Sequence, residues 1–387
     1  MSKHLADYDS GPLYFKDAKD CYLYDIFGAR YLDFIAGWCV GNLGWKRKEI
    51  IEAVKKEAEG GFYVPPFVRW RKWEELASLL CKIAPGKLSR AFRCTGGSEA
   101  VEFAIKCARA TIGKKIIVSI DGVYHGHTYG AASVGNACNE KINPCAPGFV
   151  KLPMPTQKNF QQVIKQFEEL VQKNDVAAFL SEPVFSNAGV FIPPPEFYPK
   201  IQEICRQYGV LLAMDEVAVG FGRCGKLFTS ELWDLQPDIM CLGKGLTGGY
   251  GGAGATLVTE EVFKKSRGIP DYSTFGWVPN ATAAMLENVK ILLKKKPWES
   301  AKILGEQMLK SLKELEKNPK VKEVRGIGLM FGIELREPIA RKIITQCALR
   351  GVLMAECDDH TLFISPPLVI GQKLADEGVR IIKKVIS

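Results

Sequence analysis

Short apolar runs alternate with amphipathic segments along most of the chain. Runs of four to six mostly apolar residues are typical of strands buried on both faces of a parallel sheet. They are Ala91–Cys94, Lys115–Ile120, Val176–Leu180, Val210–Met214 and Ile239–Leu242. Helical spacing of apolar residues after Ser98, over Phe160–Lys173 and over residues 196–208 predicts helices between them. This alternation favours an α/β fold with a parallel sheet.

The rest of the chain has weaker patterns. Tyr22–Ile26 and Tyr31–Phe34 alternate like short hairpin strands around Gly28. Helices are expected over Lys46–Glu59 and Trp73–Ile83, whereas residues 130 to 155 show no clear period and are expected to be irregular. From Met285 onward, long helices alternate with short strands.

Charged side chains follow two of the apolar runs at their carboxyl ends. Asp215 comes directly after Met214, and Lys244 stands between two glycines after Leu242. Open α/β sheets place their chemistry at the carboxyl ends of the strands, so both side chains are expected in one crevice. A desolvated lysine can form a Schiff base with an aldehyde, and a carboxylate can keep a pyridinium nitrogen protonated. Singly, Lys244 also fits a solvated loop lysine and Asp215 a helix cap.

A glycine turn precedes another predicted helix. Thr95-Gly96-Gly97-Ser98-Glu99 leads into the pattern of Val101, Ala104, Ile105 and Ala108. The free N–H groups and the dipole at such a helix start favour an anion. A plain capping turn with Ser98 as the N-cap is the alternative interpretation, and the two are compatible.

The stretches DEVAVGFGRCGKLF and PDIMCLGKGLTGG resemble the class III (ornithine/acetylornithine-type) aminotransferases, which depend on pyridoxal 5'-phosphate (PLP). The resemblance extends over nearly the whole chain. It implies PLP fold type I: a large domain with a mostly parallel seven-stranded sheet between helices, and a smaller α+β domain from both chain ends. The implied boundaries are 1-55 for the N-terminal segment that joins the small domain, 56-284 for the large PLP-binding domain and 285-387 for the C-terminal small domain.

The resemblance also assigns roles around the cofactor. Lys244 would carry the cofactor and act as general base and then acid, while Asp215 would keep the ring nitrogen protonated. The ring would lie between Tyr124 and Val217, with His125 and Glu182 beside it. Gly97 and Ser98 would hold the phosphate, together with Thr274 of the partner subunit. This sharing implies an obligate homodimer, with a tetramer left open.

Substrate residues are less defined. Trp38 fits either a core aromatic or a pocket wall, and Arg69 fits either a surface residue or a ligand for a substrate carboxylate. Three positions depart from the ornithine and acetylornithine pattern. Ala218 replaces a glutamine, Phe363 replaces the arginine that grips the α-carboxylate, and Asn187 replaces the glutamate that pairs with that arginine. Losing both charges leaves a more apolar pocket without a carboxylate clamp.

The predicted function is therefore amino transfer from an ω-amine, ω-amino acid or β-amino acid to a keto acid such as pyruvate. An acetylornithine/ornithine-type enzyme using 2-oxoglutarate, a PLP-dependent 2,1-aminomutase or a racemase, and a PLP-binding protein without turnover are the alternatives.

Bulk properties limit the other possibilities. The chain has 387 residues, 47% of them hydrophobic, which suffices for one large and one smaller domain. The net charge of +9 is dispersed except at Lys294-Lys295-Lys296, which is better explained as a helix end before Pro297 than as a nucleic-acid patch. No apolar run spans a membrane, no export signal is evident, and the two nearby histidines, His125 and His127, lack a third metal ligand. The twelve cysteines are scattered without a CxxC pair, so most are expected to be reduced core thiols in a cytoplasmic protein.

Overall fold

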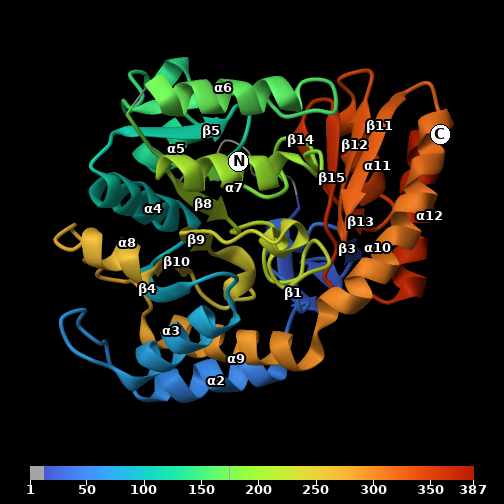
Figure 1. Cartoon of the computed structure of the whole chain (residues 1–387). Coiled ribbons are helices and arrows are strands. Elements are labelled where there is room, and N and C mark those ends of the chain that lie inside the picture. The colour runs from blue at the N-terminus through green and yellow to red at the C-terminus, as the bar shows by residue number, and fades with distance from the viewer. Residues whose placement is uncertain (1–12, 174) are drawn as a thin grey trace.

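The computed structural model describes residues 13–173 and 175–387. Among these residues, a seven-stranded sheet with the order β4-β10-β9-β8-β7-β5-β6 forms the centre of the larger part of the molecule (Figure 1). Strand β10 is antiparallel to both of its neighbours, and the pairs from β9 to β6 are parallel. The strands are β4 (Leu88–Cys94), β5 (Ile116–Ile120), β6 (Phe149–Leu152), β7 (Val176–Ser181), β8 (Leu211–Asp215), β9 (Ile239–Leu242) and β10 (Gly254–Thr259). The predicted mostly parallel sheet is confirmed.

Helices cover both faces of this sheet. Helix α4 (Gly97–Ile112) buries its apolar side against one face, in a cluster that includes Ala178, Ala213 and Cys241. On the other face, α6 (Phe160–Lys173) and α7 (Phe197–Tyr208) cover β5, β7 and β8. Toward the β4 end of the sheet, helices α2 (Lys48–Glu59), α3 (Arg71–Ile83) and α9 (Pro279–Lys295) pack over β4, β10 and β9. Figure 1 shows these three helices together at the bottom of the view. The strands are therefore apolar on both sides, as their sequences predict.

The smaller part contains two four-stranded sheets. The first has the order β1-β2-β3-β13, and the second has the order β11-β12-β15-β14. The parallel pair β3–β13 joins the two ends of the chain, with Leu32 opposite Val352. The strands are β1 (Phe15–Lys19), β2 (Tyr22–Asp25), β3 (Arg30–Asp33), β11 (Val321–Ile327), β12 (Met330–Leu335), β13 (Val352–Leu353), β14 (Ala355–Asp358) and β15 (Thr361–Ile364).

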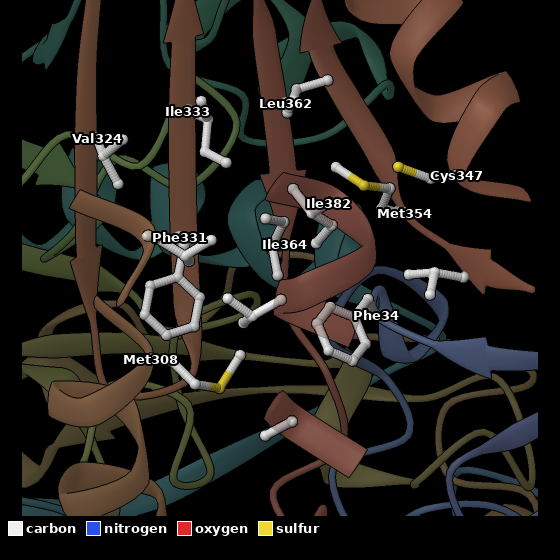
Figure 2. Packing of buried hydrophobic residues seen from close by; sticks show 14 of the residues in the cluster. Phe34, Met308, Val324, Phe331, Ile333, Cys347, Met354, Leu362, Ile364 and Ile382 are labelled. Carbon is white, nitrogen blue, oxygen red and sulfur yellow. The ribbon is translucent and has the colours of Figure 1, made fainter. Parts of the chain in front are cut away.

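One core ties these sheets to the C-terminal helices α10 (Pro297–Lys313), α11 (Ala340–Ala348) and α12 (Gln372–Ile386). Figure 2 shows Phe34, which follows β3, among residues from β12, β15 and α12. Both chain ends therefore contribute to the smaller part, as predicted. The boundaries 1-55, 56-284 and 285-387 themselves stay a prediction.

The expectation that residues 130 to 155 are irregular is wrong. The segment contains helix α5 (Tyr129–Val134) and edge strand β6, which pairs in parallel with β5. Both elements are too short to show a period, and Lys151 interrupts the apolar run of β6. The remaining short helices are α1 (Ala36–Cys39), α8 (Glu260–Lys265), η1 (Glu140–Ile142), η2 (Thr229–Trp233), η3 (Lys244–Leu246) and η4 (Glu314–Lys317).

The cysteines also need one correction. Cys138 and Cys145, which lie in this same segment outside the core, form a disulfide with their Cα atoms 6.1 Å apart. The other ten are free, and most are buried, as predicted. Within the described part of the chain, no helix has the length and apolar character needed to cross a membrane.

Candidate active site

A cavity of about 150 Å³ opens where five strands of the central sheet end. The segments after β4, β5, β7, β8 and β9 all contribute to its lining. Parallel strands bring their carboxyl ends to one edge, so residues far apart in sequence meet there. The lining residues are Gly97, Ser98, Tyr124, His125, Gly126, Glu182, Ser186, Asn187, Asp215, Val217, Ala218 and Lys244.

Asp215 is the last residue of β8 and is almost fully buried, with 3% of its surface exposed. Its Oδ2 lies 2.7 Å from Nδ1 of His125, and its Oδ1 accepts a hydrogen bond of 3.0 Å from the backbone N–H of Val217. These contacts fix the orientation of the carboxylate. Within the described residues, Nε2 of His125 is buried without a hydrogen-bond partner. The sequence placed His125 beside the cofactor ring, and the structure shows that it also contacts Asp215 directly.

Lys244 opens the short helix η3, directly after β9 and Gly243. Its φ is +39°, in the left-handed region that costs a residue with a side chain conformational energy. Lys244 is half-buried and lines the same cavity as Asp215. The prediction that the two strand ends aim an amine and a carboxylate at one crevice is therefore consistent with the fold.

The first turn of α4 lines another side of the cavity. Gly96 is the N-cap, so Ser98 is the second helical residue and not the cap that one interpretation expected. The Oγ of Ser98 instead accepts from the backbone N–H of His127 at 3.2 Å. A Cβ on Gly97 would come within 2.7 Å of Cγ1 of Val217, so only glycine lets the helix start approach this closely.

Glu182 is a second buried carboxyl in the cavity, at the end of β7. Burial raises the pKa of Glu182 to about 8, and the charge of Asp215 adds to this rise. The hydroxyl and the N–H of Ser186 donate to its two oxygens at 2.7 and 3.0 Å, and these bonds oppose the shift. Burial also raises the pKa of the Tyr124 phenol. The raised pKa of Glu182 means that this carboxyl group is largely protonated at neutral pH.

These residues fit the predicted cofactor. The N-terminus of a sixteen-residue helix can hold a phosphate, and Asp215 is pre-oriented to hold a ring nitrogen. Among the lining residues, Lys244 is the amine that can bind an aldehyde. Tyr124 and Val217 also line the cavity, as a ring between them requires.

Four predicted residues do not line this cavity. Phe363 of β15 is buried next to it, in one apolar cluster with Ala218 and Val184, and its ring stacks on Trp38 at 4.8 Å. Arg69 is exposed and pairs with Glu74 at 2.6 Å, so its predicted substrate role has no support within one chain. Thr274 is exposed outside the cavity, with its carbonyl accepting from the Tyr63 hydroxyl at 2.6 Å.

Sequence reasoning missed two features of the site. Ser186 binds Glu182, and its position four residues later in the same motif was an available signal. The hydrogen bond between His125 and Asp215 joins residues 90 positions apart, which no local pattern indicates.

Comparisons with known proteins identify the family of this chain. The family model described as "Aminotransferase class-III" matches residues 6–386. The acetylornithine aminotransferase of Methanosarcina acetivorans is 32% identical over 98% of this chain and 93% of that protein. The putrescine–pyruvate aminotransferase of Pseudomonas aeruginosa is 33% identical over 96% of this chain and 89% of that protein.

A solved structure extends the likeness to the fold. An amine transaminase from an uncultivated Pseudomonas species, in its PLP-bound form, superposes with a TM-score of 0.93 at 29% identity, covering 100% of this chain and 97% of that one. Because the family model, the relatives and the fold all agree, the chain belongs to the class III aminotransferases, which are PLP-dependent transferases.

Proposed function

We propose that this protein transfers the amino group of an ω-amine, ω-amino acid or β-amino acid to a keto acid such as pyruvate. The observation that carries the proposal is the wall formed by Phe363. This side chain is 1% exposed and lies in an apolar cluster with Ala218 and Val184, beside the cavity. The cavity lining contains no arginine, so nothing there clamps a carboxylate in the bidentate manner that favours 2-oxoglutarate or glutamate.

Each residue of the site has a separate role toward the cofactor. When bound, PLP acts as an electron sink that stabilises negative charge at the substrate carbon. Nζ of Lys244 would hold the cofactor aldehyde. Once free, it would take the proton from the amine-bearing carbon as a general base and deliver it, as a general acid, to the cofactor carbon that bore the aldehyde. Asp215, oriented by His125, keeps the ring nitrogen protonated. Tyr124 and Val217 confine the ring, and Glu182 lies beside it.

Gly97 and Ser98 would bind the phosphate together with Thr274 of the partner subunit. The exposed position of Thr274 supports this, because a residue that serves a neighbouring site has to lie on the surface of its own chain. The working form is then a homodimer with shared sites, and we place it in the cytoplasm because most of the cysteines are free.

An acetylornithine-type activity is the second candidate. It is favoured by the Methanosarcina relative, which carries that name and is as similar as the putrescine–pyruvate enzyme. The two candidates differ at Phe363 and Asn187, because the acetylornithine type needs a charged pair where this chain has an aromatic ring and an amide.

The test begins with visible spectra of the PLP-loaded protein before and after each amine is added without an acceptor. We expect the visible absorption band of the bound cofactor to change when diamines, ω-amino acids or β-amino acids are added. The same band should stay unchanged with ornithine or glutamate. Alanine formation from pyruvate then separates transamination from mutase or racemase chemistry.

Two variants sharpen the result. The double variant Phe363→Arg with Asn187→Glu is expected to raise turnover with 2-oxoglutarate relative to pyruvate, whereas Phe363→Leu should keep the wild-type preference. Bleaching of the wild type by glutamate or acetylornithine would overturn the substrate class. If no visible band forms after reconstitution with PLP, the role of Lys244 itself is wrong.

A further inference from the structure

We propose that Asn288 is a positioning residue for Lys244, although it lies outside the cavity. Asn288 is on α9 and is 1% exposed. Its side-chain amide donates to the backbone carbonyls of Gly245 and Leu246 at 2.8 and 3.0 Å. These two carbonyls belong to η3, the short helix that begins at Lys244.

The turn at Lys244 needs such support. Lys244 has a φ of +39°, which is unfavourable for a residue with a side chain. Within η3, the N–H groups of Leu246 and Thr247 bond back to Gly243 and Lys244 at 2.8 and 3.1 Å. The carbonyls of Gly245 and Leu246 lie in buried residues, where an unsatisfied carbonyl is costly. Asn288 satisfies both, and so it holds the strained turn closed.

The chemistry of the contact fixes how the amide points. Both partners are carbonyl oxygens, which only accept, so the NH₂ group of Asn288 must face them. Within the described residues, its Oδ1 is then buried without a hydrogen-bond partner. An apolar residue would pack here without that cost. The neighbouring residues on this face of α9 are the apolar Ala281, Ala284 and Met285. The hydrogen bonds to the carbonyls of Gly245 and Leu246 therefore explain why a buried amide stands here.

A second buried asparagine closes the other side of the turn. A Cβ on Gly245 would lie 2.7 Å from Nδ2 of Asn42, which itself donates to the carbonyl of Phe221 at 3.0 Å. The segment after Lys244 is thus held between Asn42 by packing and Asn288 by hydrogen bonds. Losing the Asn288 donors frees η3 to relax φ at Lys244, which moves Nζ relative to Asp215.

The main test compares wild type with Asn288→Leu, which keeps the volume and removes both donors, and Asn288→Ser, which keeps one donor. For Asn288→Leu we expect kcat to fall roughly 10- to 100-fold, the range expected for a reacting group displaced by about 1 Å. KM for the amine should stay within about threefold of wild type, because the substrate wall is untouched. The pH titration of the visible band should be displaced, and Asn288→Ser should be intermediate.

A readout without cofactor complements these measurements. In the PLP-free protein, the rate at which an amine-reactive ester labels Lys244, measured by peptide mass spectrometry against other lysines, should change in Asn288→Leu. The matched control is Asn318→Ala, which removes an amide that donates to the carbonyl of Ile386 at 3.3 Å in the smaller part of the molecule. It should leave kcat, the band and the labelling rate as in wild type.

The inference rests on the proposed role of Lys244, and the outcomes separate the two. Borohydride reduction of the PLP-loaded wild type, followed by peptide mapping, should place the cofactor on Lys244, and a label on another residue refutes that role. If the label is on Lys244 but Asn288→Leu only lowers the melting temperature, with unchanged kcat, band titration and labelling rate, Asn288 is merely structural and the inference is overturned.

Discussion

At the scale of single residues, burial changes the acidity of one carboxyl group in the cavity, that of Glu182. Glu182 and Asp215 both lie at strand ends, and both are nearly inaccessible to solvent. The pKa of Glu182 rises from 4.5 to about 8, first because of desolvation and then because of Asp215. Asp215 instead has His125 and a backbone N–H as partners. Two similar carboxyl groups thus acquire different tasks from their surroundings.

This raised pKa predicts a pH-dependent stability. The native state holds the proton of Glu182 at pH values where the unfolded chain has lost it. The contribution of Glu182 is therefore present below about pH 4.5 and is lost as the pH rises to about 8. Glu182→Gln, which resembles the protonated form, should gain stability relative to wild type across this window, measured by denaturant unfolding of the PLP-free protein at pH 5, 7 and 9.

An exposed carboxyl provides the comparison. Glu52 lies on the exposed side of α2, and its surface salt bridge with Lys55 contributes little to stability. The free energy of unfolding of Glu52→Gln should therefore change with pH in the same way as that of wild type. If the free energy of unfolding of Glu182→Gln also changes with pH as that of wild type does, Glu182 is not held protonated in the native state.

At the scale of elements, glycines set how closely helices approach the site. Gly97 begins α4 against Val217, where a Cβ would be only 2.7 Å from Cγ1. Its neighbour Gly96 has no atom within 4 Å of a built Cβ and an extended φ of 179°. The same helix start thus contains one glycine that is required by packing and one that is not.

This contrast predicts different effects of adding one methyl group. Gly97→Ala should displace Val217 or the first turn of α4 and weaken PLP binding by roughly tenfold or more, about 1.4 kcal/mol. Gly96→Ala should bind PLP within about threefold of wild type, since it meets no atom. Fluorescence titration of the PLP-free proteins measures both constants. Equal affinities in the two variants would contradict a phosphate site built on this turn.

Helix α12 makes a similar close contact in the smaller part. A Cβ on Gly378 would lie 2.1 Å from Cζ of Phe34, whereas Gly371 at the start of the same helix has open space. Gly378→Ala should overpack this core and lower the free energy of unfolding by about 1–3 kcal/mol. Gly371→Ala should cost less, and urea unfolding measures the difference. If both variants lose the same free energy of unfolding, the core around Phe34 can rearrange to accept the added methyl group.

At the scale of the whole molecule, Thr274 does not line the cavity of its own chain. Thr274 lies beside the exposed side chains of Tyr63 and Phe275. The Tyr63 hydroxyl donates to the Thr274 carbonyl, and the Tyr63 ring is 6.4 Å from that of Phe275. Large exposed apolar patches mark interaction surfaces. This arrangement is consistent with the proposed dimer, in which Thr274 of the partner subunit completes the phosphate site.

Subunit mixing tests that arrangement. In a heterodimer of Lys244→Ala and Thr274→Ala chains, one site combines an intact Lys244 with an intact Thr274 if the two are shared across the interface. We expect the purified heterodimer to show about half of the wild-type activity at low PLP concentration, because one of two sites is complete. If Thr274 serves its own chain, the only site with an intact Lys244 carries Thr274→Ala, and the heterodimer shows about half of the activity of the Thr274→Ala homodimer.

The sequence by itself determined five strands of the large sheet and the candidate site residues at their ends, because these depend on local patterns. Apolar runs marked β7, β8 and β9 to within a residue, and the motifs that follow those strands supplied Glu182, Asp215 and Lys244. The sequence did not predict α5 and β6, because elements of six and four residues are too short to show a period.

Only the tertiary structure decided which residues touch. The hydrogen bond between His125 and Asp215 joins residues that are 90 positions apart. The hydrogen bond from Asn288 to the carbonyl of Gly245 joins residues that are 43 positions apart. Such contacts follow from how parallel strands and α9 are stacked, and no spacing along the chain encodes them. The same packing stacked the buried Phe363 on Trp38 and left Arg69 and Thr274 exposed on the surface of the chain.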